Sequence, residues 1–150
     1  MFFLKDLPTR EMLNAYGDVY PDMKPDAVEK ALILLRHASL LMRDLEKYFA
    51  KHSLSQTRFI ILILLDRQPD QDGLTAIDLV SKMDISKTVI SKTVHSLEKE
   101  GLIKISEHKH DARSKWLRLT VSGKKVLSDV LPGYYKIIND FMENNDTQAP

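Results

Sequence analysis

Residues 75–123 constrain the fold of this 150-residue chain more than any other segment. Their pattern predicts two short helices joined by a tight turn and followed by a charged β-hairpin. Thr75 is a good N-cap for a first helix over 75–83, whose apolar side is expected to consist of Ile77, Leu79, Val80 and Met83. Ser86 is a good N-cap for a second helix. Hydroxyl side chains favour these positions because they accept hydrogen bonds from the free amides of a helix's first turn. Gly101 suits the end of the second helix. This layout is typical of a helix-turn-helix.

The second predicted helix, residues 86–101, has an apolar side and a polar side. At 3.6 residues per turn, Ile90, Val94 and Leu97 fall together and would pack on the rest of the domain. A helix that lies in the major groove of DNA needs this division, although an ordinary amphipathic helix has the same spacing. Its first three turns carry no acid that would repel phosphate. The polar side consists of Thr88, Ser91, Lys92, His95 and Lys99.

Two alternating segments, 102–107 and 116–120, predict the strands of a hairpin after the second helix. The sequence between them, HKHDARSK, is polar and rich in cations. Such a tip is expected to act as a wing that reaches the neighbouring minor groove, which is narrow, negative and suited to arginine. We predict that Arg113 makes this contact and that Asp111 holds its guanidinium in a bidentate pose.

Charge is unevenly distributed along the chain, although the formal net charge is only +1. Residues 75–125 carry 11 Lys and Arg against 6 Asp and Glu, a net +5, and the remaining residues carry 11 against 15, a net −4. This asymmetry favours a surface that attracts phosphates. Charge alone would fit a merely solvated basic face equally well.

The flanking residues predict further helices. Residues 26–51 carry two apolar stripes, which indicates one face on the chain's own core and another on a partner subunit, or a central helix buried within a monomer. Residues 55–67 include FIILILL, whose periodicity does not distinguish a helix from a strand. Ser55 as an N-cap and Gln68-Pro69 as a stop predict a buried helix. A short helix is expected over 9–16. After residue 120 a helical pattern is expected to break at Pro132 and Gly133, before a last helix over 134–142.

Several classes of protein are disfavoured. The chain has no cysteine, which excludes disulfides and thiolate zinc sites. Its longest apolar run, residues 59–65, is far shorter than the roughly 20 residues of a transmembrane helix. The N-terminus lacks a signal-peptide pattern, so a cytoplasmic protein is expected. No glycine-rich phosphate loop or nucleophile elbow is present, so neither an enzyme nor a cofactor is predicted.

Two other functions share the predicted fold. A metal-responsive regulator is suggested by His108, His110 and Asp111, but two imidazoles are too few for a closed zinc site, and no metal ligands are predicted. A winged helix used only as a protein adaptor would be expected to carry apolar residues on the outer side of the second helix. That side is instead polar and basic, which favours DNA.

Taken together, these motifs resemble the MarR family of transcription regulators over about half the chain. The likeness lies in Leu74-Thr75, in residues 86–92, in LEKEGLI at 97–103, in Asp111-Ala112-Arg113 and in LTVSG at 119–123. It implies a homodimer with residues 86–99 in the major groove, and repression that is often relieved by a small-molecule effector. It also implies terminal dimerisation helices. The sequence departs from the family at Pro132, which implies a shorter C-terminal region, and at Lys92, where an arginine's planar fork is expected.

The predicted fold is therefore mainly α with a small β-hairpin wing, as a single domain over residues 1–150. Residues 54–121 would form the winged helix-turn-helix lobe, and residues 1–51 and 122–145 the dimerisation helices. Double-stranded DNA and a second copy of the chain are the predicted partners. The predicted DNA-binding residues are Thr75, Ser86, Lys87, Thr88, Ser91, Lys92, His95, Lys109, Asp111, Arg113 and Lys115.

Overall fold

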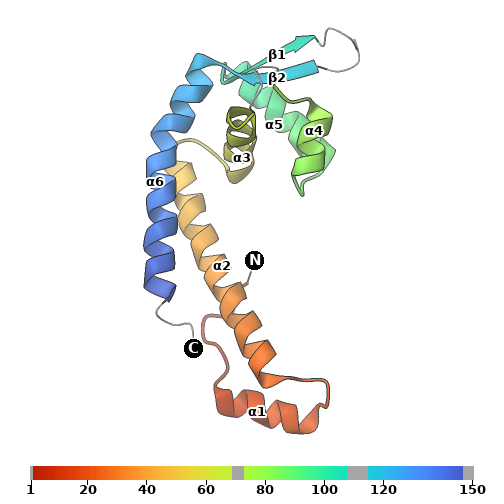
Figure 1. The fold of residues 1–150 in the computed structure, drawn as a ribbon, viewed down its shortest axis with the longest axis vertical. Helices are drawn as coiled ribbons and strands as arrows, with labels where there is room; N and C mark the ends of the chain where they lie inside the picture. The colour runs from red at the N-terminus through yellow and green to blue at the C-terminus, as the bar shows by residue number, and fades with distance from the viewer. Residues whose placement is uncertain (1, 69–72, 108–114, 147–150) are drawn as a thin grey trace. The chain divides into compact units, whose positions relative to one another are not determined.

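The computed structural model describes residues 2–68, 73–107 and 115–146 (Figure 1). Its order of elements confirms the predicted fold class, with one two-stranded hairpin among helices. The chain divides into two compact units, residues 46–136 and residues 1–45 with 137–150. The elements in chain order are α1 (Arg10–Val19), α2 (Pro25–Lys51), α3 (Gln56–Asp66), α4 (Ala76–Lys82), α5 (Lys87–Lys99), β1 (Ile103–Glu107), β2 (Lys115–Leu119) and α6 (Val121–Asp146).

The core of the unit formed by residues 46–136 is built around α3. Sequence periodicity could not assign FIILILL to helix or strand, and the structure confirms the helix that its flanks predicted. The Ser55 hydroxyl caps this helix by accepting a hydrogen bond from the Arg58 amide at 3.2 Å. The buried side chains of α3 are Phe59, Ile61, Leu62, Ile63 and Leu65. An almost wholly apolar helix thus provides the surface on which the rest of this unit packs.

The hairpin is joined to the start of the helix-turn-helix by backbone hydrogen bonds. β1 and β2 pair antiparallel, with Ile103 opposite Leu119. Leu74, just before α4, exchanges two hydrogen bonds with Leu117, at 3.1 and 2.7 Å. Gly73 has a φ of +86°, and a Cβ there would collide with the Leu117 carbonyl. Glycine is therefore required for this approach.

The LTVSG motif forms the corner between β2 and α6. The Thr120 hydroxyl donates to the Gly101 carbonyl at 2.6 Å and accepts from the Gly123 amide at 3.0 Å. A side chain at Gly123 would collide with the Leu102 carbonyl. The threonine and the glycine of this motif therefore bring the first turn of α6 against the chain that leaves α5.

The predicted break at Pro132 and Gly133 is wrong, because α6 runs continuously from Val121 to Asp146. A proline inside a helix removes one amide donor and strains the preceding turn, a cost that packing can offset. The Tyr48 hydroxyl donates to the Val130 carbonyl at 2.9 Å, in the turn where the proline lies. A Cβ at Gly133 would collide with the Tyr48 ring, so this glycine admits the tyrosine instead of ending the helix.

The unit formed by residues 1–45 with 137–150 contains α1 and the first part of α2. Arg10 on α1 forms ion pairs with Asp26 and Glu29 of α2, and this lowers the pKa of the Asp26 carboxyl. The predicted short helix over 9–16 is confirmed with a longer C-terminal end, and Thr9 is its N-cap. Within the described residues, none of the helices has the length and apolarity needed to cross a membrane.

The two apolar stripes predicted for α2 are only partly buried. Leu45 is buried, but Leu34 on one stripe is 69% exposed and Leu35 on the other is about half exposed. The alternative in which α2 is buried on both sides within a monomer is therefore wrong for these residues. Their exposure leaves apolar surface on α2 that this chain does not cover.

Asp78 completes a capping box at the start of α4, which yields a pH-dependent prediction. Its carboxylate accepts hydrogen bonds from the Thr75 amide and hydroxyl, both at 2.8 Å, and these lower its pKa. A carboxyl whose pKa is lower in the folded state than in the unfolded state stabilises the fold fully at pH values above the unfolded-state pKa. This stabilisation is lost as the pH falls through the folded-state pKa. We expect Asp78→Asn to lower the free energy of unfolding by about 1 kcal/mol at pH 7.

This difference between wild type and Asp78→Asn should shrink when chemical denaturation is repeated at pH values that fall below the unfolded-state pKa of about 4 and through the lowered folded-state pKa. Asp84→Asn, at an exposed position in the turn after α4, is the control and should have little effect at either pH. A loss of stability in Asp78→Asn that is the same at both pH values would contradict the capping role of the carboxylate.

The contact between Gly133 and Tyr48 gives a second prediction. Alanine is a better helix former than glycine by about 1 kcal/mol, so Gly133→Ala would stabilise an open helix. Here the new methyl group meets the Tyr48 ring, and overpacking of this kind costs about 1–3 kcal/mol, so we expect a lower free energy of unfolding. In a Tyr48→Ala background the same substitution should become stabilising. Urea unfolding of the wild type, the two single variants and the double variant measures the effect. If Gly133→Ala changed the free energy of unfolding in the same direction with and without Tyr48, the contact would be refuted.

Candidate nucleic-acid interface

The two helices of the predicted helix-turn-helix begin at the predicted residues. The Thr75 hydroxyl accepts a hydrogen bond from the Asp78 amide at 3.2 Å, and the Ser86 hydroxyl accepts one from the Val89 amide at 3.4 Å. Only the short connection around Asp84 and Ile85 separates α4 from α5. Both N-caps are therefore confirmed, and the caps set where each helix starts its first turn.

The two sides of α5 are divided as the spacing predicted. Ile90, Val94 and Leu97 are buried. On the opposite side Ser91 is half-buried, whereas the remaining predicted residues are exposed, namely Thr88, Lys92, His95 and Lys99. Lys87 is also exposed in the first turn, beside the Ser86 cap. An accessible helix side of this composition can donate to and accept from the edges of bases and can neutralise phosphates.

The start of α4, the middle of α5 and the two strands of the hairpin line a pocket of about 270 Å³. Its inner lining is apolar and includes Val94, Ile105 and Leu117. Four of the predicted DNA-binding residues, from three separate segments, line the same pocket: Thr75, Ser91, His95 and Lys115. The fold thus brings hydroxyl groups, an imidazole and an ammonium group together beside α5, the second helix of the helix-turn-helix.

Two of the predicted DNA-binding residues, Thr75 and Ser86, also have a structural role. The Thr75 hydroxyl both accepts from the Asp78 amide and donates to the Asp78 carboxylate, so it is already engaged within the capping box. Ser86 caps α5 in a similar way. Lys115 is exposed and opens β2, where it lies opposite Glu107 of β1. Lys109, Asp111 and Arg113 lie outside the described residues, so the contact of Arg113 with the minor groove stays a prediction.

The predicted apolar side of α4 is partly wrong. Leu79 and Met83 are buried as expected, but Val80 is partly exposed and Ile77 is 71% exposed and lines the pocket. At 100° per residue Ile77 lies about 160° from Leu79 around the helix. The helix period alone therefore indicated that Ile77 does not share the buried side of α4.

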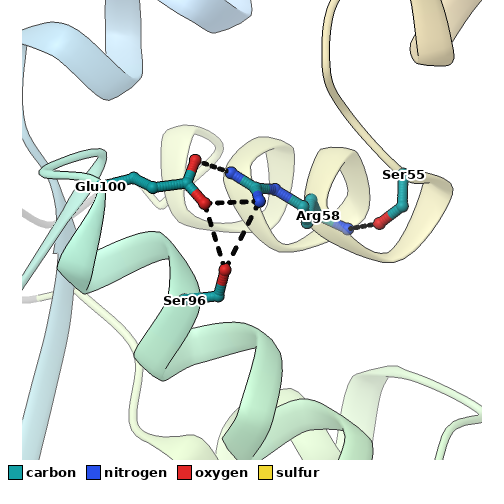
Figure 2. Close-up of polar contacts among 4 residues, drawn as sticks. All are labelled: Ser55, Arg58, Ser96 and Glu100. Atoms are coloured by element: carbon teal, nitrogen blue, oxygen red, sulfur yellow. Dashed lines mark hydrogen bonds and ion pairs between the residues drawn. The ribbon is translucent and has the colours of Figure 1, made fainter.

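The C-terminal end of α5 is bound to α3 by a cluster that sequence reasoning missed (Figure 2). The two terminal nitrogens of Arg58 contact the two carboxylate oxygens of Glu100, one of them at 2.8 Å. The Ser96 hydroxyl donates to the same carboxylate at 3.2 Å. The Arg58 hydrogen bonds are the main reason why the pKa of Glu100 is lowered. No local pattern could reveal this cluster, because Arg58 and Glu100 are 42 residues apart.

A helix-turn-helix followed by a hairpin, with a polar and basic outer side on its second helix, defines a winged helix-turn-helix protein. The family model described as MarR family matches residues 52–114 of this chain. Over these residues the chain is similar to the MarR family of transcriptional regulators.

Individual known proteins are also similar to this chain over most of its length. The HTH-type transcriptional repressor YetL of Bacillus subtilis (strain 168) is 29% identical over 94% of this chain and 84% of its own length. A MarR family transcriptional regulator from Streptomyces coelicolor, solved in complex with DNA, has a TM-score of 0.70 at 21% identity, covering 80% of this chain and 74% of that one. CouR from Rhodococcus jostii RHA1, solved with p-coumaroyl-CoA, has a TM-score of 0.62 at 18% identity, with 80% of each chain covered.

Proposed function

We propose that this chain is a dimeric transcriptional regulator that reads a specific sequence of double-stranded DNA with α5. The observation that carries the proposal is the division of α5 into a buried apolar side and an accessible polar and basic side, next to the hairpin. The solved complex of a similar Streptomyces coelicolor regulator with DNA supports it.

Within this proposal the residues of α5 divide their roles. Thr88, Ser91 and His95 can hydrogen-bond to base edges in the major groove. Lys92, in the centre of the exposed side, binds phosphate or guanine as a single point charge, since lysine lacks the bidentate fork of arginine. Lys87, near the start of α5, and Lys115, the first residue of β2, would bind phosphates. Arg113 would enter the minor groove, and Lys109 and Asp111 would support that contact.

We propose that the chain acts as a repressor whose DNA binding is released by a small-molecule effector. The support for repression is the similarity to YetL, a transcriptional repressor, over nearly the whole chain. The support for an effector is CouR, which shares the fold and was solved with p-coumaroyl-CoA. An effector of this kind must bind the free protein more tightly than the DNA-bound form, because only differential affinity shifts an equilibrium.

A dimer is proposed because the unit formed by residues 1–45 with 137–150 exposes many large apolar side chains. Soluble monomers rarely leave extensive apolar patches uncovered, and such patches mark interaction surfaces. On α1, Met12, Tyr16 and Val19 are spaced to lie on one side of the helix. The exposed large apolar residues of this unit are Phe3, Leu4, Met12, Tyr16, Val19, Tyr20, Leu34, Leu35 and Met142. A second copy related by a two-fold axis is the simplest partner for this surface.

The DNA proposal is tested by selecting bound sequences from random double-stranded DNA and then measuring affinities for the selected site. We expect a palindrome whose half-site centres lie about one helical turn apart. Lys92→Ala and Arg113→Ala should each weaken binding and reduce the slope of log affinity against log salt concentration by about one, because each removes a cation that lies against the DNA. Lys30→Ala on α2 changes the net charge equally and should bind as wild type does. Wild-type affinity of both variants at matched salt would refute the assignment.

The dimer is tested by sedimentation. The wild-type protein should sediment at twice the 17.2 kDa of one chain. Leu34→Glu places a charge on an exposed apolar position of the proposed interface and should raise the dissociation constant of the dimer at least about tenfold. Val121→Glu, a matched change at an exposed valine of the other unit, should leave the dimer intact. A wild-type monomer at micromolar concentration would contradict the proposed interface.

A further inference from the structure

We infer that Arg58 and Glu100 are positioning residues that set the angle at which α5 presents its outer side, although neither belongs to that side. This inference rests on the proposed reading of DNA by α5. It concerns a contact between α3 and the C-terminal end of α5, both within the unit formed by residues 46–136 (Figure 2).

Apolar packing alone holds α5 without fixing its direction tightly. Ile90, Val94 and Leu97 bury the inner side of the helix, but hydrophobic contacts depend on area and not on angle. Close packing of these side chains limits the tilt of α5, and a directional contact at its C-terminal end restricts it further. A directional contact is needed to select one orientation.

The contact between Arg58 and Glu100 is directional. Both terminal nitrogens of the planar guanidinium meet both oxygens of the carboxylate, and such paired contacts fix the relative orientation of the two groups. Ser96, one turn earlier on α5, donates to the carboxylate and lies 3.5 Å from the guanidinium. Two successive turns of α5 are therefore tied to one arginine.

The arginine itself is held rigidly on α3. Its side chain is only 17% exposed, whereas that of Glu100 is 48% exposed. Its backbone amide donates to the Ser55 cap in the first turn of α3. Its Nε is buried without a hydrogen-bond partner in the described part of the chain, so the terminal nitrogens alone direct the group.

The distance along α5 amplifies any change at this contact. At a rise of 1.5 Å per residue, Thr88 lies about 18 Å along the helix axis from Glu100, so a tilt of about 10° at the C-terminal end displaces Thr88 by about 3 Å. Hydrogen bonds to base edges do not survive a displacement of that size. Phosphate contacts made by flexible lysines tolerate it. Loss of this contact should therefore reduce specific binding more than nonspecific binding.

The test compares the affinity for the selected operator with the affinity for unrelated DNA at matched salt. Arg58→Met keeps much of the aliphatic stem, and Glu100→Gln keeps the side-chain shape, so both should remain folded. Each should lose about tenfold in operator affinity, the cost of about one base contact, and less than twofold on unrelated DNA. The double variant should lose no more than either single variant, since all three remove the same contact.

Two further variants separate orientation from stability. Arg58→Lys keeps the charge but not the fork, so operator affinity should stay low even where the thermal midpoint returns toward wild type. Asp129→Asn breaks the ion pair with Lys125 on α6, which lies in the same unit but outside the cluster, and should leave the operator affinity unchanged. Wild-type operator affinity in Arg58→Met and Arg58→Lys, or equal losses on operator and unrelated DNA, would overturn the inference.

A measurement without DNA distinguishes this inference from the proposed function. Because the chain has no cysteine, spin labels can be placed at Asp66→Cys on α3 and Glu98→Cys on α5, both exposed positions. The distance distribution should broaden or shift in Arg58→Met. An unchanged distribution refutes the positioning role whatever the protein binds, whereas a wild-type protein that prefers no DNA sequence refutes the proposed function alone.

Discussion

The structure of the winged helix-turn-helix lobe, residues 54–121, depends on one constraint. The helix α5 must bury one side completely and leave the other side accessible. Ile90 and Leu97 are fully buried, and Val94 nearly so, while Thr88 and Lys92 remain exposed. The apolar helix α3 supplies much of the surface that α5 covers. A helix anchored in this way can present polar groups to a ligand without losing its place in the core, because burial and recognition use opposite sides.

Specific polar contacts then join the neighbouring elements to this helix. Leu74 pairs with Leu117 through the backbone, so the start of α4 moves with the hairpin. The Thr120 hydroxyl binds the Gly101 carbonyl at the end of α5. The interaction of Arg58 with Glu100 ties the same end to α3. These contacts are short-ranged and directional, so they hold the two helices and the hairpin in one geometry, which supports a role in reading a fixed DNA surface.

Sequence reasoning succeeded where a structural feature depends on neighbouring residues. The hydroxyl caps Ser55, Thr75 and Ser86 were identified because a cap acts on an amide three residues later. It failed at Pro132, where local propensity predicts a break but the Tyr48 contact across the unit supports a continuous α6. It also placed Ile77 wrongly on the buried side of α4, although the helix period puts this residue nearly opposite Leu79.

The sequence by itself determined the order of elements as far as the hairpin, the caps and the two sides of α5, because these follow from helix period and from hydrogen bonds within one turn. Only the tertiary structure decided that Thr75, Ser91, His95 and Lys115 line one pocket, and that Arg58 meets Glu100. Both arrangements join residues from separate elements. Their distances follow from how α3, α4, α5 and the hairpin pack, and no periodicity along the chain encodes that packing.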